Sequence, residues 1–151
     1  MIKKIGTKES IIILENNYIG YLSYIAQNTP YVVPVTYFFD RNSNNLLFYS
    51  ADGHKIKAMR NYYWVSMLVT EIRSVNDWNS VLVHGRFNEL EGINSKAKLH
   101  DFSRGVKELI RIKEHKKMDF INEFSSKAYQ GKTPIVYQVK DIEITGRKRR
   151  T

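Results

Sequence analysis

Apolar and polar residues follow a helical spacing at the start of the chain and an alternating spacing in the segments after it. Residues 7–16 place Ile11, Ile12 and Leu14 on one face behind Thr7, a residue type that commonly caps helices. Runs rich in β-branched and aromatic residues follow, separated by polar clusters that are typical of turns. We therefore expect a helix over 7–16, a short basic helix over 54–61, and strands over 19–25, 31–39, 46–50, 64–72 and 81–90.

The pattern becomes helical again in the last third of the chain, over about 96–127. Gly105 weakens the middle of this region and the charged stretch 113–117 offers a break, so we expect two helices. Pro134 stops the pattern, and residues 135–139 form a strand that must rejoin the earlier sheet to bury its faces. The chain therefore predicts one domain over 1–151 of mainly β (α+β) class, with about six mostly antiparallel strands and flanking helices.

Length and composition agree with a single packed domain. The chain has 151 residues, 42% of them hydrophobic, which is enough for one core. It has no cysteine, which excludes disulfides, thiolate metal sites and a cysteine nucleophile. No apolar run approaches the roughly 18 residues that span a bilayer, and the first residues lack a secretory pattern. We expect a cytoplasmic protein without a membrane partner.

The formal net charge of +9 favours anionic partners, which include nucleic acid, an acidic membrane surface and a phosphorylated small molecule. Part of the excess lies in the run RKRR at 147–150, which we interpret as part of a solvated basic tail over about 146–151. Most aromatic residues lie in strand-like segments, where they commonly fill cores and interfaces. Nucleic-acid binding is therefore not favoured.

The stretch YSADGHKIKAMR at 49–60 places small residues where a strand gives way to a helix. The first turn of a helix has unpaired N–H groups and a partial positive charge, so Lys55 beside it would complete a phosphate site. In the simpler alternative, Asp52 caps the helix and its lysines form a solvated face. Because helix starts are far more common than phosphate sites, these residues alone favour the helix cap.

Two further segments stand out. Pro34 removes a backbone donor in the middle of a strand-forming run, which predicts an edge strand or a bulge. Trp78 and Ser80 lie two residues apart and would share one face of a strand. The chain has no paired metal-ligand spacing, no nucleophile elbow, no Walker-type loop and no Rossmann glycine pattern.

Taken together, PYVVPVTYFFD, LLFYSADGHKIKAMR and DWNSVLVHGRFNEL resemble the pyridoxamine 5'-phosphate oxidase-like FMN-binding split-barrel family, especially its nitroimidazole-reductase-like branch. The resemblance runs in the same order from about residue 19 to residue 90, and VYQVKDIEITGR is similar to the family's final strand. Three motifs in the same order are more specific than any one of them. With the resemblance taken into account, we favour a phosphate site over a helix cap at 49–60.

The resemblance implies a set of cofactor contacts. One segment would lie along the isoalloxazine ring and offer backbone groups to it, namely Val33, Pro34, Val35, Thr36 and Tyr37. Ser50 and Ala51 would flank the cofactor, while Gly53, His54 and Lys55 would hold the FMN phosphate. The pocket would be completed by Trp78, Ser80 and Val81, with FMN at a homodimer interface.

The implied activity is flavin-dependent oxidation or reduction of a small molecule, with a nicotinamide as a candidate electron donor. No catalytic residue is assigned; Tyr37, Tyr49 and His54 are candidates for proton delivery by their chemistry alone. The alternatives are a non-catalytic flavin-binding or haem-binding module on the same barrel and a basic nucleic-acid-binding domain.

Overall fold

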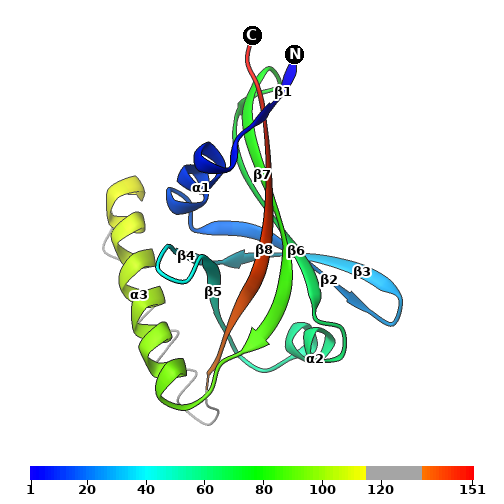
Figure 1. The fold of residues 1–151 in the computed structure, drawn as a ribbon, viewed down its shortest axis with the longest axis vertical. Coiled ribbons are helices and arrows are strands. Elements are labelled where there is room, and N and C mark those ends of the chain that lie inside the picture. The colour runs from blue at the N-terminus through cyan, green and yellow to red at the C-terminus, as the bar shows by residue number, and fades with distance from the viewer. Residues whose placement is uncertain (115–133) are drawn as a thin grey trace.

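The computed structural model describes residues 1–114 and 134–151, which form one antiparallel sheet with three helices around it. The strands run in the order β3-β2-β6-β7-β8-β5-β4, and β1 pairs with β8 beside this path. Figure 1 shows α3 along the side of β4 and β5, and α2 near β2. In chain order the elements are β1 (Ile2–Ile5), α1 (Thr7–Glu15), β2 (Ile19–Ala26), β3 (Thr29–Thr36), β4 (Phe38–Asp40), β5 (Asn45–Ser50), α2 (His54–Asn61), β6 (Trp64–Ser74), β7 (Asp77–Glu89), α3 (Gly92–Glu114) and β8 (Ile135–Arg149).

The predicted mainly antiparallel α+β architecture is confirmed, and β3 with its Pro34 lies at an edge of the sheet as expected. The predicted strand over 31–39 is divided at Tyr37, directly after the last β2–β3 pair of Ile19 with Thr36. The backbone N–H of Tyr37 donates to the Tyr18 carbonyl at 2.9 Å, and its side chain is fully buried. β4 begins at the next residue and pairs with β5 instead.

β8 is much longer than the predicted strand over 135–139. Ile142 and Ile144 pack against the core, whereas Glu143 and Thr145 are exposed. The alternation of a half-buried strand therefore continues beyond residue 139. The basic run 147–149 is therefore part of β8, paired with both β1 and β7, and not a solvated tail. Figure 1 shows that this end of β8 lies beside the N-terminus in a projecting arm.

β7 begins four residues before the predicted start at 81, because the turn after β6 is shorter than the polar run suggests. Arg73 and Asp77 close this turn through an ion pair of 2.8 Å, and Ile72 lies opposite Trp78 in the ladder. Trp78 and Ser80 consequently belong to the strand and share its outer face.

The main core lies inside the curved sheet, and a smaller apolar cluster under α3 joins Leu47 of β5 to Phe102, Val106 and Ile110. α3 runs without a break through Gly105, the residue expected to weaken the middle of the first helical segment. A Cβ at Gly105 would collide with the Phe38 ring, so the glycine permits close packing of the helix on β4. The predicted second helix after the 113–117 stretch lies outside the described residues.

Candidate functional site

Five of the predicted cofactor contacts lie within six residues at the junction of β5 and α2. Ser50 is buried at the end of β5, and its hydroxyl donates to the Ala51 carbonyl at 2.8 Å. Gly53 is the N-cap of α2 in extended backbone, and no side chain caps the helix. Asp52 lies 3.9 Å from the Arg60 guanidinium instead. The alternative in which Asp52 caps the helix is therefore wrong, and the N–H groups of the first turn are left without a side-chain acceptor.

Lys55 is the half-buried cation of this turn. Burial lowers its pKa below the usual 10.5. No carboxylate forms an ion pair with it among residues 1–114 and 134–151, whereas Arg60 on the same helix binds Glu89 at 2.8 Å. A desolvated lysine without a counter-ion favours an anionic ligand.

His54 is the first residue of α2, and two tyrosines of the β2–β3 hairpin hold its ring. The Tyr24 hydroxyl and His54 Nδ1 are 3.1 Å apart, and burial raises the pKa of Tyr24, so its hydroxyl keeps its proton. Tyr24 stacks on Tyr31 with ring centroids 5.5 Å apart, and Tyr31 meets the His54 ring edge-on at 5.0 Å. When the imidazole is neutral and accepts this bond at Nδ1, its Nε2–H remains free to donate to a ligand.

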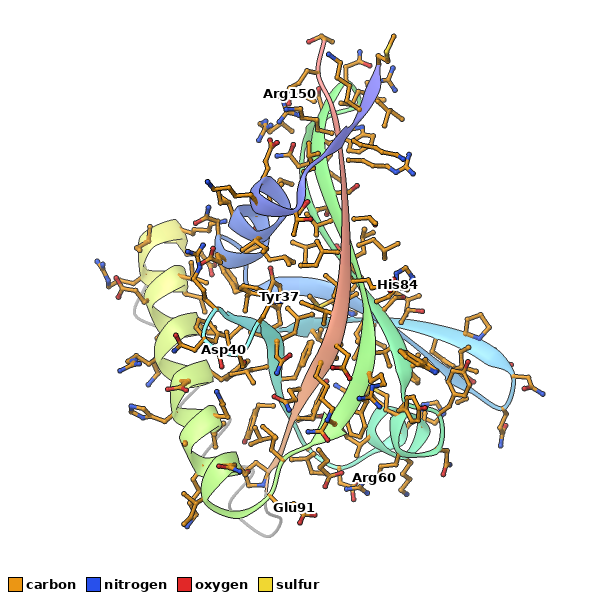
Figure 2. All side chains as sticks on the ribbon, in the orientation of Figure 1. Tyr37, Asp40, Arg60, His84, Glu91 and Arg150 are labelled. Carbon is orange, nitrogen blue, oxygen red and sulfur yellow. The ribbon has the colours of Figure 1, made fainter. Side chains whose placement is uncertain are left out.

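A cleft of about 710 Å³ opens beside His54, between α2 and the turn of the β2–β3 hairpin. His54, Lys57 and Asn61 line one wall at helical spacing. Gln27 and Asn28 of the turn line the opposite wall, and Tyr62 closes one end. A second hollow of about 340 Å³ shares Tyr62 and Ile25 with the cleft and extends along the sheet to His84. Figure 2 shows His84 on the sheet, away from the core.

The predicted ring-binding segment of β3 alternates between the two faces of the sheet. The Val33 and Val35 side chains are partly buried against the core, while Pro34 is exposed at the edge. Thr36 ends the strand half-buried. The hydroxyl of Tyr37 donates to the Leu14 carbonyl at 2.8 Å, and burial and the Glu71 charge raise its pKa. Because the Tyr37 hydroxyl is buried and donates to the backbone, it is not available to deliver a proton to a ligand.

The β7 residues of the predicted site are not brought to α2 within one chain. Val81 is fully buried in the core. The Trp78 carbonyl accepts a hydrogen bond of 3.0 Å from Arg150, which Figure 2 places at the tip of the arm, at the opposite end of the molecule from Arg60 on α2. Ser80 lies two residues further along the same strand. Trp78 and Ser80 can approach an α2 site only if they come from a second copy.

The outer face of β2, β3 and β6 is unusually apolar for a free surface. In the ladder Tyr21 lies opposite both Pro34 and Leu68, so their side chains share this face. Several large side chains of these strands are 37–70% exposed: Ile19, Tyr21, Ile25, Val32, Trp64 and Ile72. A concentration of exposed apolar side chains on one face is typical of a protein–protein contact.

Sequence reasoning missed Tyr24, Tyr31 and Lys57. The signal for the tyrosines was a two-residue turn at 27–28, which places Tyr24 directly opposite Tyr31. For Lys57 the signal was its spacing of three from His54.

Other kinds of site are not evident in the described structure. Across the two described ranges, no group of three or more histidine, aspartate or glutamate residues could hold a metal ion. No described helix is long and apolar enough to cross a membrane.

The fold and the segments around α2 define this chain as a split β-barrel protein. Comparison with solved structures agrees: a FAD-binding protein from Mesorhizobium loti has a TM-score of 0.70 at 24% identity, covering 100% of this chain and 98% of that one. A putative 5-nitroimidazole antibiotic resistance protein from Bacteroides thetaiotaomicron has a TM-score of 0.68 at 15% identity, covering 98% and 89%. At these identities the likeness concerns the fold.

Sequence comparison is more specific. Residues 7–132 match the pyridoxamine 5'-phosphate oxidase family, so the chain belongs to this family, as its motifs predicted. An uncharacterised protein from Rhizobium meliloti is 43% identical over 61 residues, which cover 40% of this chain and 39% of that protein's length.

Proposed function

We propose that this protein binds FMN with the flavin phosphate at the start of α2, in a site completed by a second copy of the chain, and acts as a flavin-dependent oxidoreductase. The observation that carries the proposal is the half-buried Lys55, which has no carboxylate partner in the described structure and lies at an uncapped helix start. Membership of the pyridoxamine 5'-phosphate oxidase family supports a phosphate-bearing cofactor of this kind.

The donors at this corner fit a phosphate group. Lys55 would supply the charge, the first-turn N–H groups of α2 would supply directed donors, and His54 Nε2 would supply one more. The ideal Cβ position of Gly53 has no atom within 4 Å, so the approach to these donors is open. Asp52 does not oppose the phosphate strongly, because Arg60 lies beside its carboxylate.

The apolar outer face supports the homodimer part of the proposal. Burial of Tyr21, Val32 and Trp64 against a second copy would remove large side chains from water. A twofold arrangement could also bring the partner's arm, with the Trp78 and Ser80 positions, toward α2.

A bound flavin would supply the electron transfer, with a reduced nicotinamide as donor and a small molecule as acceptor. The protein's own part is to hold the phosphate, shield the ring from water and offer β3 backbone groups to its polar edge.

The first test is the absorbance spectrum of the purified protein, followed by identification of any released chromophore. Flavin bands and released FMN support the proposal. Turnover of a nicotinamide donor with an artificial acceptor then tests the oxidoreductase part separately.

A haem Soret band without flavin bands would favour a haem-binding module, for which a structural relative offers a reason. A FAD and heme binding protein from Mycobacterium smegmatis has a TM-score of 0.71 at 11% identity, covering 99% of this chain and 74% of that one. A colourless protein that binds neither flavin nor haem, but is retained on nucleic acid, would contradict the proposal.

A further inference from the structure

The paired ends of β1 and β8 form a basic surface on the arm. In this ladder Lys3 lies directly opposite Lys148, and Lys4 lies directly opposite Arg147. Like charges at directly opposite positions destabilise an antiparallel pair of strands. Two of the four residue pairs that join β1 to β8 are therefore repulsive in the free protein.

Few acidic groups offset this charge. Glu9 lies 3.5 Å from Lys148, and Asp77 lies 3.1 Å from the Arg150 guanidinium. Within the two described ranges, the cations of β1 and residues 146–149 that form no ion pair are Lys3, Lys4, Arg147 and Arg149. An anionic partner that neutralised these four cations would also relieve the repulsion between the two strands.

The simplest alternative is that the cations only protect a sheet edge from aggregation. Lysines often have this role on edge strands, and β1 pairs only with β8 among the described strands. This explains Lys3 and Lys4. It does not explain Arg147 and Arg149, because β8 pairs at these residues with β1 on one side and with β7 on the other. Arginine is also the cation best suited to bind a phosphate group through two donors.

The cations project from both faces of the paired strands. Side chains alternate between the faces along a strand, so Lys3 lies on one face, and Lys4 lies with Arg147 and Arg149 on the other. A flat lipid surface meets one face at a time. The major groove of B-DNA is about 12 Å wide, admits a β-ribbon and is bordered by phosphates on both sides. The arrangement therefore favours double-stranded DNA over an anionic membrane.

The basic surface is also separate from the proposed flavin site of the same chain. Figure 1 shows β1 beside the end of β8 in the arm, away from α2. Figure 2 places Arg150 at the tip of the arm and Arg60 of α2 at the opposite end. β8 lies between β1 and β7, so DNA that approaches from the free edge of β1 leaves β7 to the second copy.

We propose that β1 and residues 146–149 bind the phosphate backbone of double-stranded DNA without sequence preference. This inference does not rest on the proposed function. The position of the aromatic residues in strands, which disfavours nucleic-acid binding, concerns stacking on bases and not contacts with phosphates.

The test is fluorescence anisotropy of a labelled DNA duplex titrated with the full chain at several NaCl concentrations. We expect the logarithm of the association constant to fall linearly with the logarithm of the salt concentration, with a slope of about −3 to −4, because each of four phosphate contacts contributes about −0.9. Affinity should fall about 100-fold between roughly 50 and 200 mM NaCl. Two duplexes of unrelated sequence should bind within about twofold of each other.

Arg147→Glu separates DNA binding from folding. It replaces a repulsive pair with an attractive one opposite Lys4, so it should keep or raise Tm while lowering DNA affinity at least about tenfold. Lys96→Glu makes the same change of charge at an exposed position of α3 and should leave DNA affinity within about twofold of wild type. Arg147→Gln should make the salt slope less steep by about 1.

Equal losses of DNA affinity in Arg147→Glu and Lys96→Glu would show that only the net charge acts, and would overturn the proposal. Binding to phosphatidylserine vesicles without binding to DNA would overturn it in favour of an anionic membrane. A protein that binds DNA as expected but no flavin would contradict the proposed function and leave this inference intact.

Discussion

A half-buried lysine without a carboxylate partner destabilises the fold that contains it, and Lys55 has no such partner among the residues that the structure describes. Burial lowers the pKa of Lys55 in the folded protein below the 10.5 of the unfolded chain. Between these two pKa values the unfolded chain binds more protons than the folded one, so the free energy of unfolding rises with pH there. At neutral pH the charge of Lys55 therefore costs stability. A residue that costs stability in the cofactor-free protein is typical of a binding site.

Lys55→Met should therefore stabilise the cofactor-free protein while weakening flavin binding. We expect a rise in Tm of roughly 2–4 °C, the shift that about 1 kcal/mol gives in a chain of this size. Thermal unfolding of both proteins, stripped of cofactor, measures this. Lys96→Met, at an exposed position of α3, is the matched control and should leave Tm unchanged. A fall in Tm of Lys55→Met would show that Lys55 already has a stabilising partner.

The lowered pKa of Lys55 also predicts how binding depends on pH. The phosphate needs the protonated amine, so FMN affinity should begin to fall at a pH below the usual 10.5 as Lys55 loses its proton. Lys55→Arg keeps its charge over the same range and should remove the fall. FMN titrations between pH 7 and pH 10, with riboflavin measured in parallel, separate this effect from titration of the ring itself. A fall that is identical in Lys55→Arg and wild type would contradict the assignment.

Tyr24 orients His54 through one hydrogen bond of 3.1 Å. Tyr24→Phe should lower FMN affinity by about two- to tenfold, the range of one neutral hydrogen bond. It should also change the ¹⁵N chemical shifts of the His54 ring, because Nδ1 loses its partner. Tyr31→Phe is the control, since Tyr31 meets the imidazole only through its ring. If the ring shifts of His54 do not change in Tyr24→Phe, the hydrogen bond does not form in solution.

At the scale of single residues, Lys55 and His54 could be proposed from the sequence because a strand-to-helix junction is a local feature, which the structure has at this point. The tyrosines that hold His54 depend on the register of β2 and β3, and Lys57 depends on which face of α2 meets the hairpin. These contacts join segments that are distant in the sequence, so the pattern of a single segment does not predict them.

Among the elements, α3 shows how packing overrides local propensity. Glycine weakens a helix by about 1 kcal/mol relative to alanine, and Gly105 lies in the middle of α3. The helix continues because tertiary contacts with β4 and β5 stabilise it. Phe102, Val106 and Ile110 pack on Leu47, and Lys98 forms an ion pair of 2.6 Å with the buried Asp40.

Burial alone would raise the pKa of Asp40, but hydrogen bonds from Lys98 and Ser43 outweigh it and lower the pKa. Asp40 therefore stays charged at neutral pH and keeps its ion pair with α3. This anchor joins residues 58 positions apart in the chain, so the helical pattern alone could not predict it.

Gly105→Ala should destabilise the protein by about 1–3 kcal/mol, despite the better helix propensity of alanine, because the added methyl group collides with Phe38. Urea unfolding measures the change. Gly53→Ala should be tolerated, since Gly53 has extended backbone and open space around it. Stabilisation by Gly105→Ala would mean that α3 packs less closely on β4 than described.

The strands show a different limit of sequence reasoning. Their central segments were predicted because apolar alternation is clear there, but β7 and β8 extend further into polar and basic residues. Pairing with neighbouring strands continues the ladder where hydrophobicity no longer marks it. The arm therefore depends on contacts between both ends of the chain, which a local pattern does not contain.

For the molecule as a whole, the separation between α2 and the arm agrees with a twofold assembly. One chain holds the proposed phosphate site near α2 and holds Trp78 at the tip of the arm. The exposed apolar side chains of β2, β3 and β6 are the surface that we propose pairs with a copy of itself.

Tyr21→Lys should therefore convert a dimer into monomers, because it places a charge within the apolar face. Light scattering after size-exclusion chromatography measures the mass. Ile112→Lys makes a similar change at an exposed position of α3 and should leave the assembly unchanged. A wild-type protein that is monomeric at high micromolar concentration would contradict the shared site.

The most direct test of the phosphate site compares FMN with riboflavin, which differs only in lacking the phosphate, in wild type and in Lys55→Met. We expect wild type to bind FMN about 10- to 100-fold more tightly than riboflavin, and Lys55→Met to lose most of that difference while its riboflavin affinity is unchanged. Equal affinities of wild type for the two ligands, or a difference that survives in Lys55→Met, would contradict the docking of a flavin phosphate at the start of α2.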